Sequence, residues 1–235
     1  MSALADRIKI ARDGMGTDIN LSIQFLLNCG SSFAGSCHGG SAIRAYEFIR
    51  NSSIGIPYDT CLSYVACSQD SVEGFCPHID SSCSAENICR TCTNPTHSID
   101  GGFCNPIEYF PNATVRRFLN LVTFNSTEKL LQKVILTDFG LCDPLFFLRY
   151  KVAEYGSYNQ EDGVFPIMAE IFLRGPVKAS INAGPLQRYK GGIIMDSAAN
   201  RNTTHNHGVS LVGWGFDKTT EIQYWIVRNS VRDQC

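Results

Sequence analysis

The high cysteine content is the feature that most constrains this chain. Eleven of the 235 residues are cysteine, and nine of these lie between positions 29 and 104. This density predicts a region whose loops are held by disulfides in an oxidising compartment. Five Asn-x-Ser/Thr sequons agree with a lumenal or secreted glycoprotein, and they lie at Asn20, Asn51, Asn112, Asn125 and Asn202.

Charge and hydropathy argue against several classes of protein. Apolar residues make up 44% of the chain and charged residues 18%, which is typical of a globular fold and not of a disordered one. The formal net charge is −2 and no basic stripe is present, so nucleic acid is not an expected partner. No apolar run is long enough for a membrane span, and residues 1–12 have the pattern of a helix, not of a signal peptide. We therefore expect the natural N-terminus to lie upstream.

Hydrophobic periodicity predicts a helical first half and a β-rich last third. Helices are expected at 2–12, 21–28, 41–50 and 163–174, the last ended by Gly175-Pro176. Residues 55–104 lack periodicity, which predicts long loops fixed by cross-links. β-branched and aromatic residues predict strands at 177–181, 192–194, 208–214 and 222–228. Together these elements predict an α+β fold.

The stretch 111–148 differs from the rest of the chain. It holds two sequons, a helix-like segment at 128–136 and the apolar cluster Leu145-Phe-Phe-Leu148. It is either an insert in the fold or sequence that does not belong to the mature protein, and composition does not separate the two.

Two segments near the C-terminus carry a specific pattern. The first reads His207-Gly-Val-Ser-Leu-Val-Gly-Trp-Gly215, and the second reads Tyr224-Trp-Ile-Val-Arg-Asn-Ser230. They resemble the histidine and asparagine motifs of the papain-like cysteine peptidases. The first half agrees, because residues 2–8 resemble the helix that carries the family's nucleophile and Gly35-Ser-Cys-His-Gly-Gly40 resembles its Cys-x-Gly-Gly turn.

The segments 56–64 and 89–92 are similar to the cathepsin X/Z branch of the family, as is 224–229. The resemblance covers about 1–109 and 150–230. It implies a two-lobed papain-like fold with a cleft between the lobes. We expect a helical, disulfide-rich left lobe over 1–110, the insert at 111–148, and an antiparallel, barrel-like right lobe over 149–235 that carries the histidine and the asparagine.

The resemblance also implies parts that this sequence does not contain. The family's nucleophile motif, Cys-Gly-Ser-Cys-Trp, would lie just before Met1. A tryptophan and a Gly-rich closing segment would follow Ser230, where the sequence reads Val-Arg-Asp-Gln-Cys instead. We therefore expect the fold to be incomplete at both ends.

The expected catalytic residues are His207 and Asn229. A cysteine peptidase needs a thiolate at neutral pH, and an imidazole beside the cysteine supplies it by taking the proton. His207 fits this base, although a histidine outside such a motif would more often be an ordinary core or loop residue. A neutral carboxamide orients the imidazole without adding a charge, and Asn229 fits that role. His205, two residues earlier, is expected to be a solvated neighbour.

The Gly-Ser-Cys37 triplet repeats letters of the family's active-site motif, but His-Gly-Gly follows it. The resemblance assigns this cysteine to a disulfide whose other half would lie upstream, so we expect Cys37 to be unpaired and not catalytic. Gly39 and Gly40 are read as turn glycines and also as substrate-binding residues, along which an extended peptide could pair.

The resemblance pairs Cys29 with Cys61. It leaves Cys142 and Cys235 without an assigned partner. The alternative to a disulfide framework is a zinc site built from Cys89 and Cys92 with Cys76, Cys83 or His78, because thiolates at this spacing suit tetrahedral coordination. The remaining disulfide candidates should pair among themselves in an order that sequence does not determine: Cys67, Cys76, Cys83, Cys89, Cys92 and Cys104.

By resemblance the function is peptide-bond hydrolysis through a thioester, with a carboxypeptidase favoured and a lysosomal or secreted location. No cofactor or metal is expected. Partners would be peptide or protein substrates, and a propeptide or inhibitor in the cleft. A catalytically inactive homologue that only binds peptides is the alternative, and a disulfide-rich structural module is a third, weaker one.

Overall fold

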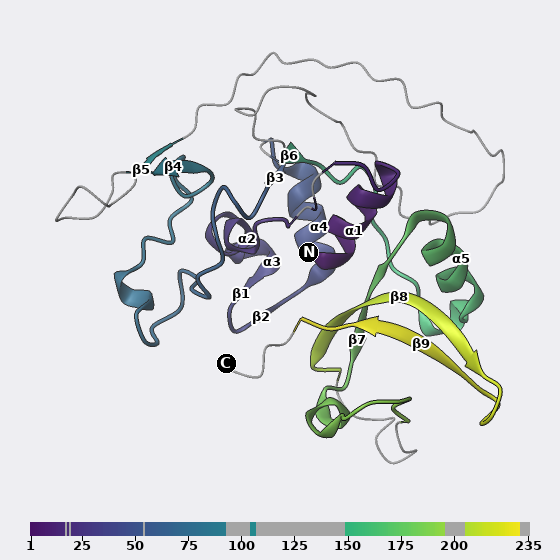
Figure 1. Ribbon diagram of the computed structural model, residues 1–235. Helices are drawn as coiled ribbons and strands as arrows, with labels where there is room; N and C mark the ends of the chain where they lie inside the picture. The colour runs from purple at the N-terminus through teal and green to yellow at the C-terminus, as the bar shows by residue number, and fades with distance from the viewer. Residues whose placement is uncertain are drawn as a thin grey trace. The chain divides into compact units, whose positions relative to one another are not determined.

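The computed structural model describes residues 1–16, 18, 20–53, 55–92, 104–106, 149–195 and 205–230. The chain forms two compact units. Figure 1 labels their helices and strands and colours the chain by residue number. Unit 1 consists of Met1 and Gly16–Ser157, and unit 2 consists of Ser2–Met15 and Tyr158–Cys235. Across the described ranges, no helix combines the length and apolar character of a membrane span.

The helices of unit 1 are α2 (Ile23–Cys29), α3 (Ser31–Ala34) and α4 (Ala42–Asn51). Ser22 is the N-cap of α2, because its hydroxyl accepts a hydrogen bond from the Phe25 amide at 3.1 Å. The same hydroxyl donates to the Leu62 carbonyl at 2.7 Å and so links the helix to the loop after β3. The Phe25 ring lies against Phe48 of α4, with ring centroids 6.0 Å apart. α3 contacts both neighbouring helices.

Short antiparallel strands complete unit 1. β1 (Gly35–Ser36) pairs with β2 (Gly39–Gly40), and β4 (Arg90–Cys92) pairs with β5 (Cys104–Pro106). β3 (Ile56–Pro57) pairs with β6 (Arg149–Tyr150), which joins the two ends of a long chain excursion. The 3₁₀ helix η1 spans Cys76–His78.

Among the described residues, three disulfides cross-link the loops of unit 1: Cys29–Cys83, Cys61–Cys89 and Cys67–Cys76. The predicted Cys29–Cys61 bridge is therefore wrong. The long loop after β3 brings Cys83 back to the end of α2, while Cys61 is bonded to Cys89. Such return paths of a long loop leave no trace in cysteine order, so the sequence could not have shown them. Cys92 and Cys104 are register partners in β4 and β5.

Unit 2 is built on the antiparallel sheet β7-β8-β9. Its strands are β7 (Val177–Ile181), β8 (His207–Asp217) and β9 (Ile222–Arg228), with a bulge between Leu211 and Gly213. The helices α1 (Ser2–Ala11) and α5 (Phe165–Arg174) both contact β8. The core between helices and sheet contains Leu4, Ile8, Ile171, Val209 and Leu211. The described part of this unit also includes the 3₁₀ helices η3 (Gln160–Asp162) and η4 (Gly184–Arg188).

A buried ion network joins α1 to α5. Arg7 donates from Nη1 to Glu170 at 2.8 Å, from Nε to the Pro176 carbonyl at 2.7 Å and from Nη2 to the Gly175 carbonyl at 3.0 Å. Arg174 forms a second ion pair with Glu170, and the Tyr158 hydroxyl donates a hydrogen bond to the Glu170 carboxylate at 3.5 Å. A buried carboxylate is tolerated when it is paired and hydrogen-bonded in this way.

The α+β prediction is confirmed, and so are most of its elements. The helices lie within two residues of their predicted starts, and β7 and β9 have their predicted bounds. A strand at 192–194 was wrong, because Gly191 and Gly192 have φ values of 140° and 82°, which interrupt extended backbone. Sequence analysis did not identify α3. The described part of unit 2 holds a three-stranded sheet and not a closed barrel.

Several predictions fall outside the described residues. They concern the 111–148 insert, the sequons at Asn112, Asn125 and Asn202, and the cysteines Cys142 and Cys235. The division of the chain into 1–110, 111–148 and 149–235 stays a prediction.

Candidate active site

His207 is the first residue of β8 and lies opposite Ile181, the last residue of β7. The preceding residue, Asn206, holds this edge of the sheet in two ways. Its amide donates to the Ile181 carbonyl at 3.1 Å, and its side-chain oxygen accepts from the Ala183 amide at 2.9 Å. The backbone just before His207 is therefore held by β7 and by the turn that follows it.

Asn229 follows the last residue of β9, and its Oδ1 lies 2.9 Å from Nε2 of His207. The two predicted residues are thus brought together from positions 22 apart in sequence by the β8-β9 hairpin. His205, by contrast, is exposed, as expected for a solvated neighbour.

A second hydrogen bond identifies the orientation of the Asn229 carboxamide. The Ser230 amide donates to Asn229 Oδ1 at 2.9 Å, and only an oxygen can accept there. Because that same oxygen faces the ring, His207 must donate from Nε2. The neutral imidazole then carries its proton on Nε2 and keeps the lone pair of Nδ1 free. Nδ1 is therefore the atom that can act as a base.

Two charged residues beside this pair were not singled out by sequence analysis. Arg228, one position before Asn229, donates from Nη1 to both carboxylate oxygens of Asp6 in α1, at 2.7 and 2.9 Å. Asp6 and Arg228 are 222 positions apart, so no spacing rule could have joined them.

Gly39 and Gly40 form β2, and the structure separates their roles. A Cβ on Gly40 would lie 2.5 Å from the Ala34 carbonyl, so the close approach of two backbones requires glycine there. Gly39 has φ of 136° and open space where a Cβ would stand. Its backbone is exposed and has room for another chain, although substrate binding stays a prediction.

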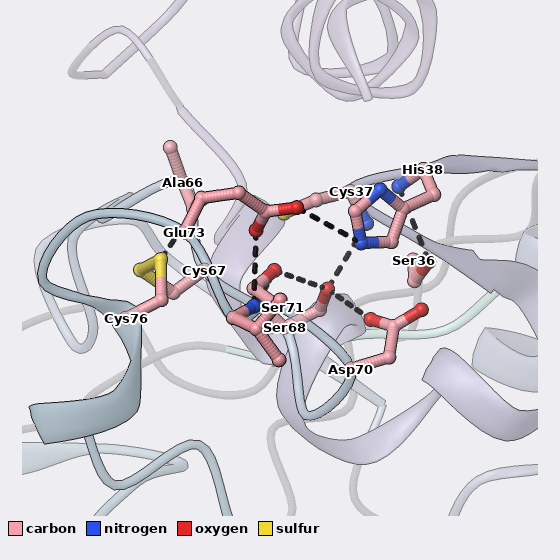
Figure 2. Close-up of polar contacts among 11 residues, drawn as sticks. Ser36, Cys37, His38, Ala66, Cys67, Ser68, Asp70, Ser71, Glu73 and Cys76 are labelled. Carbon is pink, nitrogen blue, oxygen red and sulfur yellow. Dashed lines mark hydrogen bonds and ion pairs between the residues drawn. A yellow bond between two sulfur atoms is a disulfide. The ribbon is translucent and has the colours of Figure 1, made fainter.

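Cys37 lies in the turn between β1 and β2, and Figure 2 shows its surroundings. It is a free, exposed thiol, as predicted. Its amide donates to the Ser68 hydroxyl at 3.1 Å, and that hydroxyl donates to Asp70 at 2.6 Å. Hydrogen bonds from Ser68 and then Ser36 hold the pKa of Asp70 below its ordinary value. His38 lies 3.8 Å from the Glu73 carboxylate. The contacts of Cys37 with Ser68 and of His38 with Glu73 hold the turn between β1 and β2 against the loop at 68–73.

The zinc alternative does not fit the cysteines found here. Cys76, Cys83 and Cys89 are each in a disulfide, so they offer no thiolate to a metal. Within the described ranges, no cluster of His, Cys, Asp and Glu side chains has the arrangement of a metal site.

Comparison with known proteins identifies the class to which this fold and site belong. The family model for papain family cysteine proteases matches residues 1–107 and 147–234. The chain belongs to the papain family of cysteine proteases, and the resemblance seen in its motifs is confirmed.

Within that family the chain is similar to Cathepsin Z of Onchocerca volvulus, with 29% identity over 97% of this chain and 54% of that protein. Cathepsin B-like cysteine proteinase 1 of Ostertagia ostertagi is 24% identical over 99% of this chain and 55% of that protein. A solved structure of digestive procathepsin L 3 from Tenebrio molitor larval midgut aligns with a TM-score of 0.49 and 22% identity, over 96% of this chain and 49% of that one. The chain spans about half the length of these relatives.

Proposed function

We propose that the protein to which this chain belongs is a cysteine peptidase in which His207 is the general base and Asn229 orients it. The observation that carries the proposal is the 2.9 Å contact between His207 Nε2 and Asn229 Oδ1, with the carboxamide oriented by Ser230. This arrangement leaves Nδ1 of an imidazole free to take a thiol proton, which is the requirement of thiolate catalysis.

The reaction proceeds in two balanced steps. The thiol gives its proton to His207 Nδ1, the thiolate attacks the peptide carbonyl, and the imidazolium returns the proton to the leaving amine as the thioester forms. Water then gives a proton to His207 and adds to the thioester, which releases the carboxylic acid and restores the thiol. The nucleophilic cysteine is proposed to lie upstream of Met1, as the family resemblance implies.

The substrate class is proposed to be peptides and proteins, trimmed from the C-terminus as in a carboxypeptidase. The exposed backbone at Gly39, with open space above it, supports pairing with an extended substrate, and Gly40 maintains the turn. A propeptide or inhibitor would use the same backbone. The specificity can be tested by incubating the full-length protein with a peptide or with its C-terminally amidated form and separating the products by chromatography. A carboxypeptidase should remove residues one at a time from the free acid only.

We propose a lysosomal or secreted location for this peptidase. Three disulfides support an oxidising compartment. Asn20 and Asn51, which begin two of the sequons, are both exposed, so a glycan could be attached at either. Treatment of the natural protein with an N-glycosidase should lower its mass, and an unchanged mass would argue against this route.

The decisive experiment is labelling of the natural full-length protein by a thiol-reactive peptidyl probe. We expect one cysteine upstream of Met1 to be labelled. His207→Ala should slow labelling by about 10²- to 10⁴-fold, the usual contribution of a general base. Arg188→Gln, an exposed change in the same unit, is the control. Equal labelling of the wild type and His207→Ala would contradict the proposal.

A peptide-binding protein without peptidase activity is the second candidate. It is supported by the exposed backbone of Gly39, which has room to pair with an extended peptide whether or not that peptide is cleaved. The same probe experiment separates the candidates. Peptide binding measured by calorimetry, with neither labelling nor turnover by the full-length protein, would support this second function.

A further inference from the structure

We propose that Asp6 and Arg228 form a positioning pair, which fixes the end of β9 so that the Asn229 carboxamide stays on the His207 ring. The inference deepens the proposed function and rests on it, because the orientation of the ring matters to a base. Neither residue touches a reacting atom. Both act through Asn229.

The geometry places the pair directly beside the candidate site. Arg228 is the last residue of β9 and is paired with Ser210 of β8, so its backbone belongs to the sheet. Its side chain reaches α1, where Nη1 lies 2.7 and 2.9 Å from the two oxygens of Asp6. The next residue is Asn229. Arg228, the residue that precedes the Asn229 carboxamide, is therefore bound to α1.

Burial argues that this ion pair acts through geometry more than through stability. The side chains of Arg228 and Asp6 are 51% and 29% exposed, and an ion pair in such surroundings contributes little to folding. The buried Arg7–Glu170 pair and the buried Leu4 and Ile8 side chains hold α1 in unit 2. Loss of the Asp6–Arg228 contact should leave the unit folded while the end of β9 gains freedom.

The helix that provides Asp6 is itself rigidly placed. Arg7, the next residue, is held by Glu170 of α5 and by the carbonyls of Gly175 and Pro176, which lead into β7. Of two consecutive residues of α1, Arg7 thus holds the residues just before β7 and Asp6 holds the end of β9, and β8 with His207 lies between these two strands. Asp6 is consequently a fixed reference point for Arg228.

The His207–Asn229 hydrogen bond needs such support because it is exposed. Water competes for both groups, and a rotated carboxamide would present its NH₂ to the Nε2 proton. The neutral ring would then lose its preference for the tautomer with Nδ1 free. Restricting the backbone before Asn229 reduces the number of conformations in which this happens.

The test combines nitrogen NMR of the His207 ring with kinetics in the full-length natural protein, using Asp6→Asn, Arg228→Gln and the charge-swapped double variant Asp6→Arg/Arg228→Asp. The signal is assigned by its loss in His207→Gln. Each single variant should speed exchange of the Nε2 proton about fivefold and lower kcat by a similar factor at unchanged KM. The double variant should recover most of both. Glu161→Gln, an exposed carboxylate loss in the same unit, should change neither.

The readouts separate failure of this inference from failure of the proposed function. Unchanged proton exchange in both single variants would overturn the positioning pair, even if the wild type labels and turns over. If the wild type shows no turnover, the proposed function fails, and the ring proton still tells whether Asp6 and Arg228 hold Asn229. Equal loss in the single variants and the charge-swapped variant would also overturn the pair.

Discussion

At the scale of single residues, the structure assigns different roles to polar groups that look alike in sequence. Ser22 and Ser210 are both buried serines. Ser22 caps α2 and also bonds to Leu62, while the Ser210 hydroxyl finds no hydrogen-bond partner among the described residues. A buried hydroxyl without a partner loses its hydration and gains nothing in return.

We therefore expect Ser210→Ala to raise the free energy of unfolding by up to about 1 kcal/mol, because it removes an unsatisfied group. Ser22→Ala is the matched control, and it should lower that free energy by about 1–2 kcal/mol through loss of the cap. Urea titrations of both variants provide the measurement. A Ser210→Ala protein clearly less stable than the wild type would show that the hydroxyl has a partner.

The candidate site could be predicted only in part. His207 and Asn229 belong to local motifs, and the free thiol of Cys37 followed from the family resemblance. Asp6 and Arg228 carried no such signal, because a charged residue on a helix or at a strand end is ordinary until the fold shows what it faces. The tautomer of His207 likewise depends on the Ser230 amide, which no motif specifies.

At the scale of elements, the buried carboxylate of Glu170 joins α5 to α1 and also affects the pKa of Tyr158. Burial, followed by the nearby Glu170 carboxylate, raises the pKa of Tyr158 to about 12. The pKa of the folded state then exceeds the ordinary value of about 10. The folded state holds this proton more tightly, so its contribution to stability is complete below about pH 10 and is lost as the pH rises to about 12.

We expect Tyr158 to titrate late in a near-ultraviolet tyrosinate titration of the folded protein, and Tyr158→Phe to remove that late step. Glu170→Gln should move the step to lower pH, since a neutral amide no longer opposes formation of the phenolate. If the late step persisted in Tyr158→Phe, another tyrosine would be responsible and the assignment would be wrong.

Secondary structure was predictable where the hydrophobic periodicity agrees with residues that end a helix or strand. Gly175-Pro176 ended α5 as expected, because glycine supplies the φ of 102° at the end of the helix. The hairpin strands β8 and β9 followed from their β-branched and aromatic residues. The failure at 192–194 came from counting apolar residues without allowing for two glycines in left-handed conformation just before and at its start.

At the scale of the whole molecule, stability of unit 1 depends on cross-links that span very different lengths of chain. Cys29 and Cys83 are 54 positions apart, whereas Cys67 and Cys76 are 9 apart. A disulfide restricts the unfolded chain more when it closes a longer loop. The pairing therefore predicts unequal contributions, which cysteine order alone could not reveal.

Replacement of both Cys29 and Cys83 by alanine should lower the free energy of unfolding by about 4 kcal/mol in the chain-entropy account. The matched control, replacement of both Cys67 and Cys76, should lower it by only about 2.5 kcal/mol. Denaturant titration of the two double variants tests the ratio. Peptide mapping without reduction tests the pairing itself, and recovery of a Cys29–Cys61 peptide would contradict the structure.

The adjacency of Asp6 and Arg7 in α1 has a consequence for how this helix can change. Successive helical residues point about 100° apart, so this one step of rotation lets the helix hold Arg228 with one side chain and Glu170 with the next. An insertion between Asp6 and Arg7 would rotate one side chain about 100° further from the other, so that one of the two contacts would be lost. In natural variants of this helix we therefore expect substitutions at exposed positions, but no insertion or deletion that separates Asp6 from Arg7.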